Sequence, residues 1–189
     1  MIHEFLSKII EWDKKTFLYL NGLGEEQYDW FWLFITEMKN WIPLYIIFLF
    51  LLLKQTSFSN IKKIVFLVIL LIVISDQTVN LFKYSFDRLR PCYNTEIQNL
   101  LRLVKDNCGG KYGFVSAHAS NHFAIAIFLG NIFSRKYKTS FFLLLIWATF
   151  IAYSRIYIGV HFPIDVIGGA ILGTFYGYIF YLIYTKFED

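Results

Sequence analysis

The chain has 189 residues, a net charge of +4, 57% hydrophobic residues, 21% aromatic residues and a mean hydropathy of +0.49. A soluble domain of this length cannot hide so much apolar surface, because much of any folded surface is already apolar. The Lys and Arg residues are scattered between apolar runs and form no dense basic block of the kind that binds nucleic acid. Composition therefore excludes an ordinary soluble domain and a nucleic-acid-binding protein, and it predicts a protein embedded in a bilayer.

The first 24 residues predict an amphipathic helix that lies in the membrane interface. Charged residues interrupt this segment, so it lacks the apolar core of a cleaved signal peptide. Apolar residues recur at helical spacing along one face, a pattern typical of helices on a membrane surface. These residues are Ile2, Phe5, Leu6, Ile9, Ile10, Phe17 and Leu20. Gly22 and Gly24 are expected to end the helix, since glycine commonly follows a helix C-terminus.

Four apolar stretches are about long enough to cross a hydrocarbon core, which takes roughly 17–25 helical residues. They cover residues 61–83, 118–133, 139–153 and 164–184. A fifth stretch, residues 29–53, is predicted to be one span with a kink near Pro43, or else a pair of half-helices. The predicted fold is all-α, a polytopic membrane helix bundle of five or six spans that forms a single domain over residues 1–189.

Loop charges predict the orientation of the bundle. The loop of residues 54–63 holds three lysines, and the loop of residues 134–138 holds three further basic residues. Short cytoplasmic loops carry an excess of Lys and Arg, so both are expected to face the cytoplasm. The outer loop, residues 84–115, and the segment of residues 154–162 then share the opposite face. We expect an integral protein of the cell (inner) membrane with these segments facing the periplasm or exterior.

The outer loop keeps five basic residues against that rule, which suggests that some of them bind a ligand: Arg88, Arg90, Arg102, Lys105 and Lys111. It also holds the two cysteines of the chain, Cys92 and Cys108. A disulfide between them can persist outside the cytoplasm, where closing such a loop stabilises a fold by about 3 kcal/mol. The alternative is two unrelated thiols. The chain has no CxxC metal motif.

Lys83 and Arg90 are seven residues apart, close to two helical turns, and Pro91 turns the chain out of the helix afterwards. Both cations can then reach one outer pocket. Alternatively, they extend to the lipid headgroups, as Lys and Arg at the ends of spans often do. Asp87 and Arg88 are expected to be solvated or paired with each other.

Ser116, Ala117 and His118 come directly before an apolar run, so Ser116 is a natural N-cap of a helix. The first amides of such a helix form an anion site, and His118 beside it can donate a proton to a leaving oxygen. The alternative is a capped helix with an interfacial histidine. His122 is placed four residues on, as in metal-binding pairs, but no third ligand accompanies the two histidines, and we expect no metal.

The segment from Ser154 to Asp165 carries the most specific pattern. His161 and Asp165 are four residues apart, and Pro163 suits the first turn of a helix. A carboxylate in this position can fix the tautomer of the imidazole and leave the other ring nitrogen free as a nucleophile or base. Arg155 offers planar, bidentate donors to an oxyanion. Together these residues point to phosphate chemistry.

At this point the chain resembles the type 2 phosphatidic acid phosphatases, which share a helical fold with vanadium-dependent haloperoxidases. Their pattern is a lysine, six residues and Arg-Pro; then Pro-Ser-Gly-His; then Ser-Arg, five residues, a histidine, three residues and an aspartate. The first and third motifs are complete here, as Lys83 with Arg90-Pro91 and as Ser154-Arg155 with His161 and Asp165. In the middle motif Val115 replaces the proline and Ala117 replaces the glycine, while Ser116 and His118 are kept. The resemblance covers the chain from about residue 29 onwards.

The resemblance implies a two-step hydrolysis of a lipid phosphate or pyrophosphate that needs no metal or other cofactor. His161, oriented by Asp165, would attack phosphorus to form a phosphohistidine, and His118 would protonate the leaving oxygen and then activate water. The phosphate-binding residues would be Lys83, Arg90, Ser116, Ala117 and Arg155. Undecaprenyl pyrophosphate, phosphatidic acid, phosphatidylglycerol phosphate and phosphorylated lipid A are the candidate substrates. The alternatives are a vanadate-dependent haloperoxidase-like enzyme and a non-catalytic membrane protein that binds lipid headgroups.

Overall fold

The computed structural model describes residues 2–105 and 107–188, and the regular structure of these residues is helical apart from one isolated bridge between Leu89 and Tyr112. Met1, at the start of the predicted interfacial helix, and Asp106, in the outer loop, lie outside the described residues, as does Asp189. The α-helices are α1 (Ile2–Gly22), α2 (Asp29–Thr36), α3 (Ile42–Gln55), α4 (Phe58–Phe86), α5 (Ala117–Ser134), α6 (Ser140–Tyr157) and α7 (Pro163–Phe187). Short 3-10 helices cover Glu26–Tyr28, Met38–Trp41 and Pro91–Tyr93.

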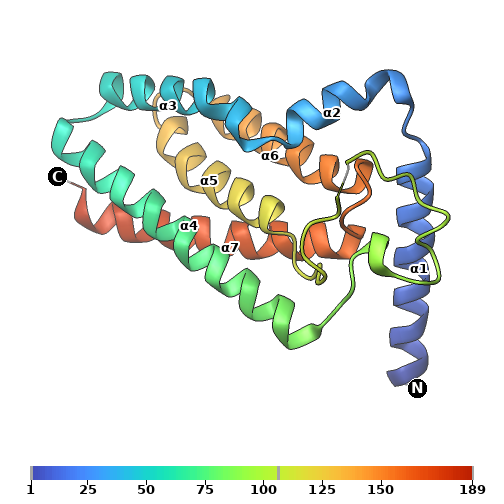
Figure 1. Ribbon diagram of the computed structural model, residues 1–189. Helices are drawn as coiled ribbons and strands as arrows, with labels where there is room; N and C mark the ends of the chain where they lie inside the picture. Colours follow the sequence, from blue (N-terminus) through green and yellow to red (C-terminus); the bar gives the residue numbers. More distant parts are fainter. Residues whose placement is uncertain (1, 106, 189) are drawn as a thin grey trace.

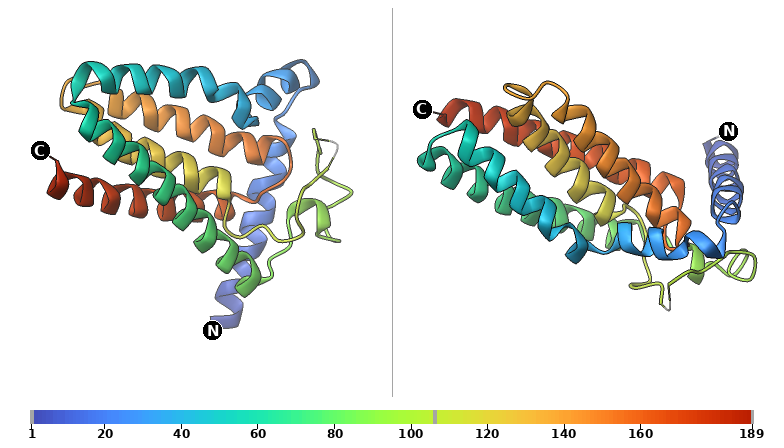
Figure 2. Two further views of the ribbon diagram at one scale, coloured as in Figure 1. Left: turned by 60° about the vertical axis from the view of Figure 1, so that its left-hand side comes forward. Right: turned by 90° about the horizontal axis from the view of Figure 1, so that it is seen from above.

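Helix α5 lies inside the bundle, where it packs against α4, α6 and α7 (Figure 1). Helices α3, α4, α6 and α7 surround it, and α1 stands across one end of the bundle, as both views of Figure 2 show. The main apolar cluster joins side chains of α3 to α7, among them Leu71, Phe128 and Ile151. The arrangement puts the start of α5 at the same end of the bundle as the start of α7.

By length and composition, α4, α6 and α7 can each cross a membrane, and the bent pair of α2 and α3 would make a fourth span among the described residues. The axes of that pair differ by 66°. The break lies at Glu37, whose backbone is extended, whereas Pro43 sits in the first turn of α3, where its missing N–H is not needed. The predicted kink at Pro43 was therefore misplaced by half a dozen residues.

Local capping explains where the helices that carry the site begin and end. The hydroxyl of Ser116 accepts from the Ala119 N–H, so α5 begins where the sequence predicts. Helix α7 begins at Pro163. Helix α4 ends at Asp87, which adopts a left-handed backbone with φ 47°, a conformation that aspartate tolerates better than most residues. This turn leads the chain out of α4 just after Lys83.

Glycines let α7 approach the backbone of α5 closely. Gly169, Gly173 and Gly177 are spaced four residues apart on one face of α7, the pattern that allows tight crossing of membrane helices. A Cβ atom on Gly173 would lie 2.1 Å from the carbonyl oxygen of Ser120. At the head of this contact the Ser116 N–H donates to the carbonyl oxygen of Asp165 at 2.9 Å. The crossing thereby brings the second and third motifs together.

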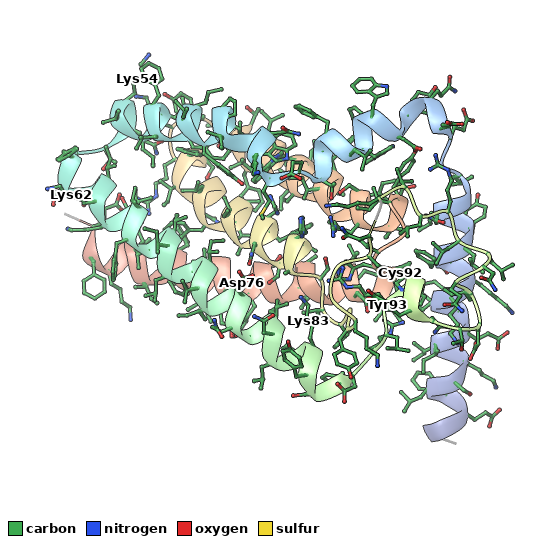
Figure 3. All side chains as sticks on the ribbon, viewed as in Figure 1. Lys54, Lys62, Asp76, Lys83, Cys92 and Tyr93 are labelled. Carbon is green, nitrogen blue, oxygen red and sulfur yellow. A yellow bond between two sulfur atoms is a disulfide. The ribbon has the colours of Figure 1, made fainter. Side chains whose placement is uncertain are left out.

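The two basic loops meet at the other end of the bundle. The Lys136 ammonium donates to the carbonyl oxygen of Lys54 at 2.8 Å, and Arg135 pairs with Glu188. In Figure 3, Lys54 and Lys62 lie at the end opposite to Lys83 and Cys92. The loops that charge assigns to the cytoplasm and the three motifs are thus separated by the length of the helices.

Candidate active site

His161 and Asp165 form the centre of the site. His161 lies in the connection between α6 and α7, and Asp165 lies in the first turn of α7; their side chains are 2% and 0% exposed. Nδ1 of the ring is 3.5 Å from Oδ2 of Asp165, longer than a hydrogen bond. Oδ2 also accepts from the Phe162 N–H at 3.0 Å. The pair predicted from the sequence is thus in place, with the carboxylate held by the backbone beside the ring.

The surroundings of His161 favour its neutral form. Burial lowers the pKa of His161 well below its usual value, and the positive charges of Arg90, Arg155 and Lys83 lower it further. A neutral imidazole has a free lone pair, which is what a nucleophile needs. The first and third motifs also converge in space, because a Cβ atom on Gly113 would lie 3.2 Å from Cγ of Arg90 and 3.0 Å from Oδ2 of Asp165.

Arg155 is buried in the last turn of α6 and is only partly satisfied. Its Nη1 donates to the hydroxyl of Thr36 at 2.6 Å, while its Nε has no hydrogen-bond partner among the described residues. A buried donor without an acceptor is costly, and a phosphoryl oxygen would satisfy it. Thr36, which lies at the end of α2 directly before the break at Glu37, was not predicted from the sequence.

Arg90 is fixed in the outer loop by the backbone. Its Nη1 donates to the carbonyl oxygen of Cys108 at 2.7 Å, and its Nε donates to that of Tyr112 at 3.3 Å. Burial lowers the pKa of Arg90, but the guanidinium remains charged at neutral pH. Lys83 is half-buried in the last turn of α4. Arg90 does not extend to the headgroups, because two backbone carbonyls hold its guanidinium in the outer loop.

Ser116 is fully buried, and its N–H is already used by Asp165. The amides that head α5 are therefore those of Ala117 and His118, and both residues are half-buried. First-turn amides without helical partners form an anion site. The structure thus places Ala117 and His118 at the helix start that the sequence proposed for phosphate binding.

His122 takes part in the packing of α5. One of its ring nitrogens, Nδ1, lies 2.8 Å from the carbonyl oxygen of His118, and the ring packs edge-on against Trp147. No group of three or more His, Cys, Asp or Glu residues that could hold a metal ion occurs in residues 2–105 and 107–188. Near His122 on α5, the hydroxyl of Ser120 lies 2.8 Å from that of Ser75.

Arg88 corrects the sequence interpretation. It was expected to be solvated or paired with Asp87, but its Nη1 donates to Oδ1 of Asp165 at 2.5 Å and its Nη2 pairs with Asp13 of α1. Asp87 is exposed at the left-handed turn that ends α4. Because that turn redirects the chain, Arg88 reaches Asp13 and Asp165 while its neighbour Asp87 stays exposed.

Cys92 and Cys108 form a disulfide across the outer loop, with 6.4 Å between their Cα atoms. The bond closes a segment whose ends are 16 residues apart, and the carbonyl of Cys108 is the acceptor for Arg90. The disulfide therefore braces one of the cations that act on His161.

Replacing both Cys92 and Cys108 with serine should lower the free energy of unfolding by about 3 kcal/mol, because the unfolded chain regains the freedom of the open loop. Thermal unfolding of the purified double variant, compared with the oxidised parent, measures this. Reducing the parent should reproduce the effect, whereas the variant should no longer respond to reductant. A melting temperature equal to that of the oxidised parent would contradict the prediction.

Comparison with known proteins agrees with this geometry. The model of the PAP2 superfamily matches residues 63–189. The lipid A 4′-phosphatase of Bacteroides thetaiotaomicron is 38% identical over 186 residues, covering 97% of this chain and 80% of that protein. The lipid A 4′-phosphatase of Porphyromonas gingivalis is 36% identical over 179 residues, covering 93% of this chain and 74% of that protein.

A solved structure shows the same fold. The transmembrane PAP2-type phosphatidylglycerolphosphate phosphatase from Bacillus subtilis superposes with a TM-score of 0.76, over 96% of this chain and 89% of that one, at 18% identity. At this identity the likeness concerns the fold alone. The family model and the curated relatives together confirm the resemblance carried by the three motifs. The chain therefore belongs to the PAP2 superfamily and is an enzyme of the phosphatase class.

Proposed function

We propose that this chain removes phosphate from a membrane lipid at the outer face of the membrane, through a phosphohistidine at His161. The observation that carries the proposal is the meeting of a buried neutral histidine, a carboxylate and three cations at one end of an apolar bundle. Lys83, Arg90 and Arg155 would hold the phosphoryl oxygens and balance the charge that builds on them in the transition state. The phosphate-binding site would be completed by the amides of Ala117 and His118 and by the hydroxyl of Ser116.

In the first step Nε2 of His161 attacks phosphorus while the bond from phosphorus to the lipid oxygen breaks. His118 donates its proton to that oxygen, so the lipid leaves as a neutral alcohol. Asp165 stabilises the positive charge that the ring acquires. In the second step a water molecule gives a proton to His118 and attacks phosphorus, the nitrogen–phosphorus bond breaks, and inorganic phosphate leaves. Both catalytic groups return to their starting protonation states.

An apolar cavity supports a lipid as the substrate. It has a volume of about 460 Å³ and lies between α3, α4 and α5, with side chains such as Phe48 and Ile69 in its wall. Asn121 and His122 are its polar lining residues, one turn along α5 from His118. The tail of a lipid in this cavity would remain in apolar surroundings while the phosphate of the same lipid reached the phosphate-binding site.

Among the candidate lipids we place a 4′-phosphate of lipid A first. Both curated relatives described above carry that activity in their names, and each aligns with more than nine-tenths of this chain. The other candidates are undecaprenyl pyrophosphate, phosphatidic acid and phosphatidylglycerol phosphate. All four share a phosphate group attached to an apolar anchor.

We further propose that the chain lies in the inner membrane with the active site on the periplasmic or outer side. Loop charge supports this, since the basic loops meet at the end far from Lys83 and Cys92 (Figure 3). The described residues offer four candidate spans when the bent pair of α2 and α3 is counted as one, and the proposal of five spans adds α5, which is not among these candidates. The exposed apolar residues of α1, among them Phe5, Ile10 and Trp12, support a place for this helix in the membrane interface.

A panel of the four lipids, offered to the purified protein with a chelator present, tests the substrate assignment. We expect inorganic phosphate to be released fastest from lipid A that carries a 4′-phosphate, and rapid acid-free quenching to trap a phosphoprotein. Faster release from another lipid would overturn the substrate, and bromide oxidation with added vanadate but no phosphate release would favour the haloperoxidase alternative. Release without a trapped phosphoprotein, under conditions where the first step outruns the second, would contradict the phosphohistidine.

A further inference from the structure

We propose that the N-terminal helix α1 belongs to the catalytic apparatus, because Asp13 and Arg88 hold Asp165, and through it His161, in the geometry for attack on phosphorus. This inference rests on the proposed role of His161 as the nucleophile. It gives Asp13 and Arg88 the role of positioning residues, which touch no substrate and act through Asp165.

The guanidinium of Arg88 bridges two buried carboxylates. Nη1 donates to Oδ1 of Asp165 at 2.5 Å, and Nη2 donates to Oδ2 of Asp13; both carboxylates are 0% exposed. Cζ of the guanidinium lies over the ring of Phe162, 4.6 Å from the ring centroid, a cation–π contact that helps to hold Arg88 in place. A planar guanidinium can donate hydrogen bonds to two acceptors in fixed directions, whereas the ammonium of a lysine cannot reproduce this geometry.

This bridge decides which oxygen of Asp165 lies beside the histidine. Oδ1 is taken by Arg88, and Oδ2 accepts from the Phe162 N–H and lies 3.5 Å from Nδ1 of His161. Without Arg88 the carboxylate could rotate about its terminal bond, because a single backbone donor does not fix both oxygens. The orientation of the catalytic carboxylate is therefore set from outside the motif that contains it.

Helix α1 reaches the same segment with three residues on successive turns. Oδ1 of Asp13 accepts from the Ile164 N–H at 3.0 Å, in the first turn of α7. Phe17 packs edge-on against Phe162 with 5.3 Å between the ring centroids. The side-chain amide of Asn21 donates to the carbonyl oxygen of Tyr157 at 2.8 Å, at the end of α6. The connection that carries His161 is thus held by α1 at both of its ends.

A buried carboxylate is a costly way to dock a helix. Asp13 lies on the face that also carries Ile9 and Phe17, where an apolar side chain would pack without the penalty of desolvating a charge. Phe17, one turn further on, packs against Phe162 and so attaches α1 to the same segment through apolar contact alone. We therefore infer that the charge of Asp13 serves the orientation of Arg88, and that simple attachment of α1 does not require it.

The test compares the parent protein with single variants at Asp13 and Arg88, with the double variant Asp13→Asn/Arg88→Met, and with two matched controls. Asp13→Asn removes one charge at constant shape, and Arg88→Met removes the bridge. Lys14→Met and Arg135→Met are matched controls. The first removes the ion pair from α1 to Glu96, which is 2.5 Å long, and the second removes the ion pair of Arg135 with Glu188 at the other end of the bundle; neither pair contacts Asp165. The measured quantities are kcat and KM for phosphate release, the melting temperature and the amount of trapped phosphoprotein.

We expect kcat of Asp13→Asn and Arg88→Met to fall about 10- to 100-fold, as for other groups that orient a reactive side chain, with little change in KM. Arg88→Lys should recover part of kcat, because it restores the charge without the fork. The double variant Asp13→Asn/Arg88→Met should have the same kcat as Arg88→Met alone, since both substitutions break the same series of contacts from Asp13 through Arg88 to Asp165. Both controls should keep the kcat of the parent.

Two results would overturn the inference while leaving the proposed function intact. One is a loss of stability in Asp13→Asn and Arg88→Met with the kcat of the folded protein unchanged. The other is a fall in kcat that the two controls share. If Arg88→Met does not fold, the kcat values of Asp13→Asn and Arg88→Lys, compared with those of the parent and the two controls, test the inference in its place. An active His161→Gln variant would instead refute the proposed function itself.

Discussion

Replacing His161 with glutamine should reduce phosphate release at least about 1,000-fold and abolish the trapped phosphoprotein. Losing a covalent nucleophile leaves only the residual catalysis of the groups that bind and polarise the substrate. His161 is 2% exposed, and glutamine fills most of its volume, so folding should be largely preserved. Steady-state assays of phosphate release, together with thermal unfolding, measure both effects. Substrate affinity should change far less than kcat, since Lys83, Arg90 and Arg155 remain.

His122→Gln is the matched control for kcat in this experiment, and KM is not compared for it because His122 lines the cavity proposed for the lipid tail. His122 is equally buried, but its ring contacts the backbone of His118 and the side chain of Trp147. Its replacement removes a buried imidazole from the same bundle without removing the nucleophile. Parental activity in folded His161→Gln would show that the nucleophile has been wrongly assigned.

Replacing Gly173 with valine should prevent α5 and α7 from packing and leave little folded protein. A Cβ atom there would lie 2.1 Å from the carbonyl oxygen of Ser120, and it would meet backbone that cannot turn aside. Forcing extra atoms into a packed interior usually costs about 1–3 kcal/mol, and contact with rigid backbone places this case at the upper end or beyond. The recovery of monodisperse protein and its melting temperature measure the effect.

Gly22→Ala provides the control, because nothing lies within 4 Å of the Cβ atom that it adds. We expect this variant to match the parent in stability and activity. The phosphatase activity of Gly173→Val should fall along with its folded fraction, since the α5–α7 crossing also brings Ser116 to Asp165. A stable and active Gly173→Val variant would contradict the close approach of α7 to the backbone of α5 at Ser120.

Local patterns in the sequence predicted much of the helical content correctly. The predicted span of residues 164–184 falls within α7, and the predicted N-cap Ser116 is the N-cap of α5. Apolar runs, capping residues and glycines act over a few residues, so they can be read without the fold. The bend at Glu37 was placed wrongly at Pro43, because proline at the start of a helix and proline within one look alike in sequence.

The motifs also supplied the candidate site residues, since their types and spacing resemble one family. The structure brings His161 beside Asp165, and the site roles of the candidate residues stay predictions until the variants are assayed. The partner of Arg155 could not be predicted, because Thr36 lies 119 residues away along the chain.

Composition and motif spacing were sufficient to establish a membrane protein, its family and the residue types of its chemistry, because these depend on residues close together in the chain or on their order. The contacts that hold the site residues in place depend instead on packing between distant parts of the chain. Whether Arg88 pairs with its neighbour Asp87 or with Asp13 and Asp165 is decided by the turn that ends α4 and by where α1 docks. Contacts between residues 75 and 77 positions apart leave no periodic trace in a sequence, so the link from the N-terminal helix to the catalytic histidine became visible only in the folded molecule.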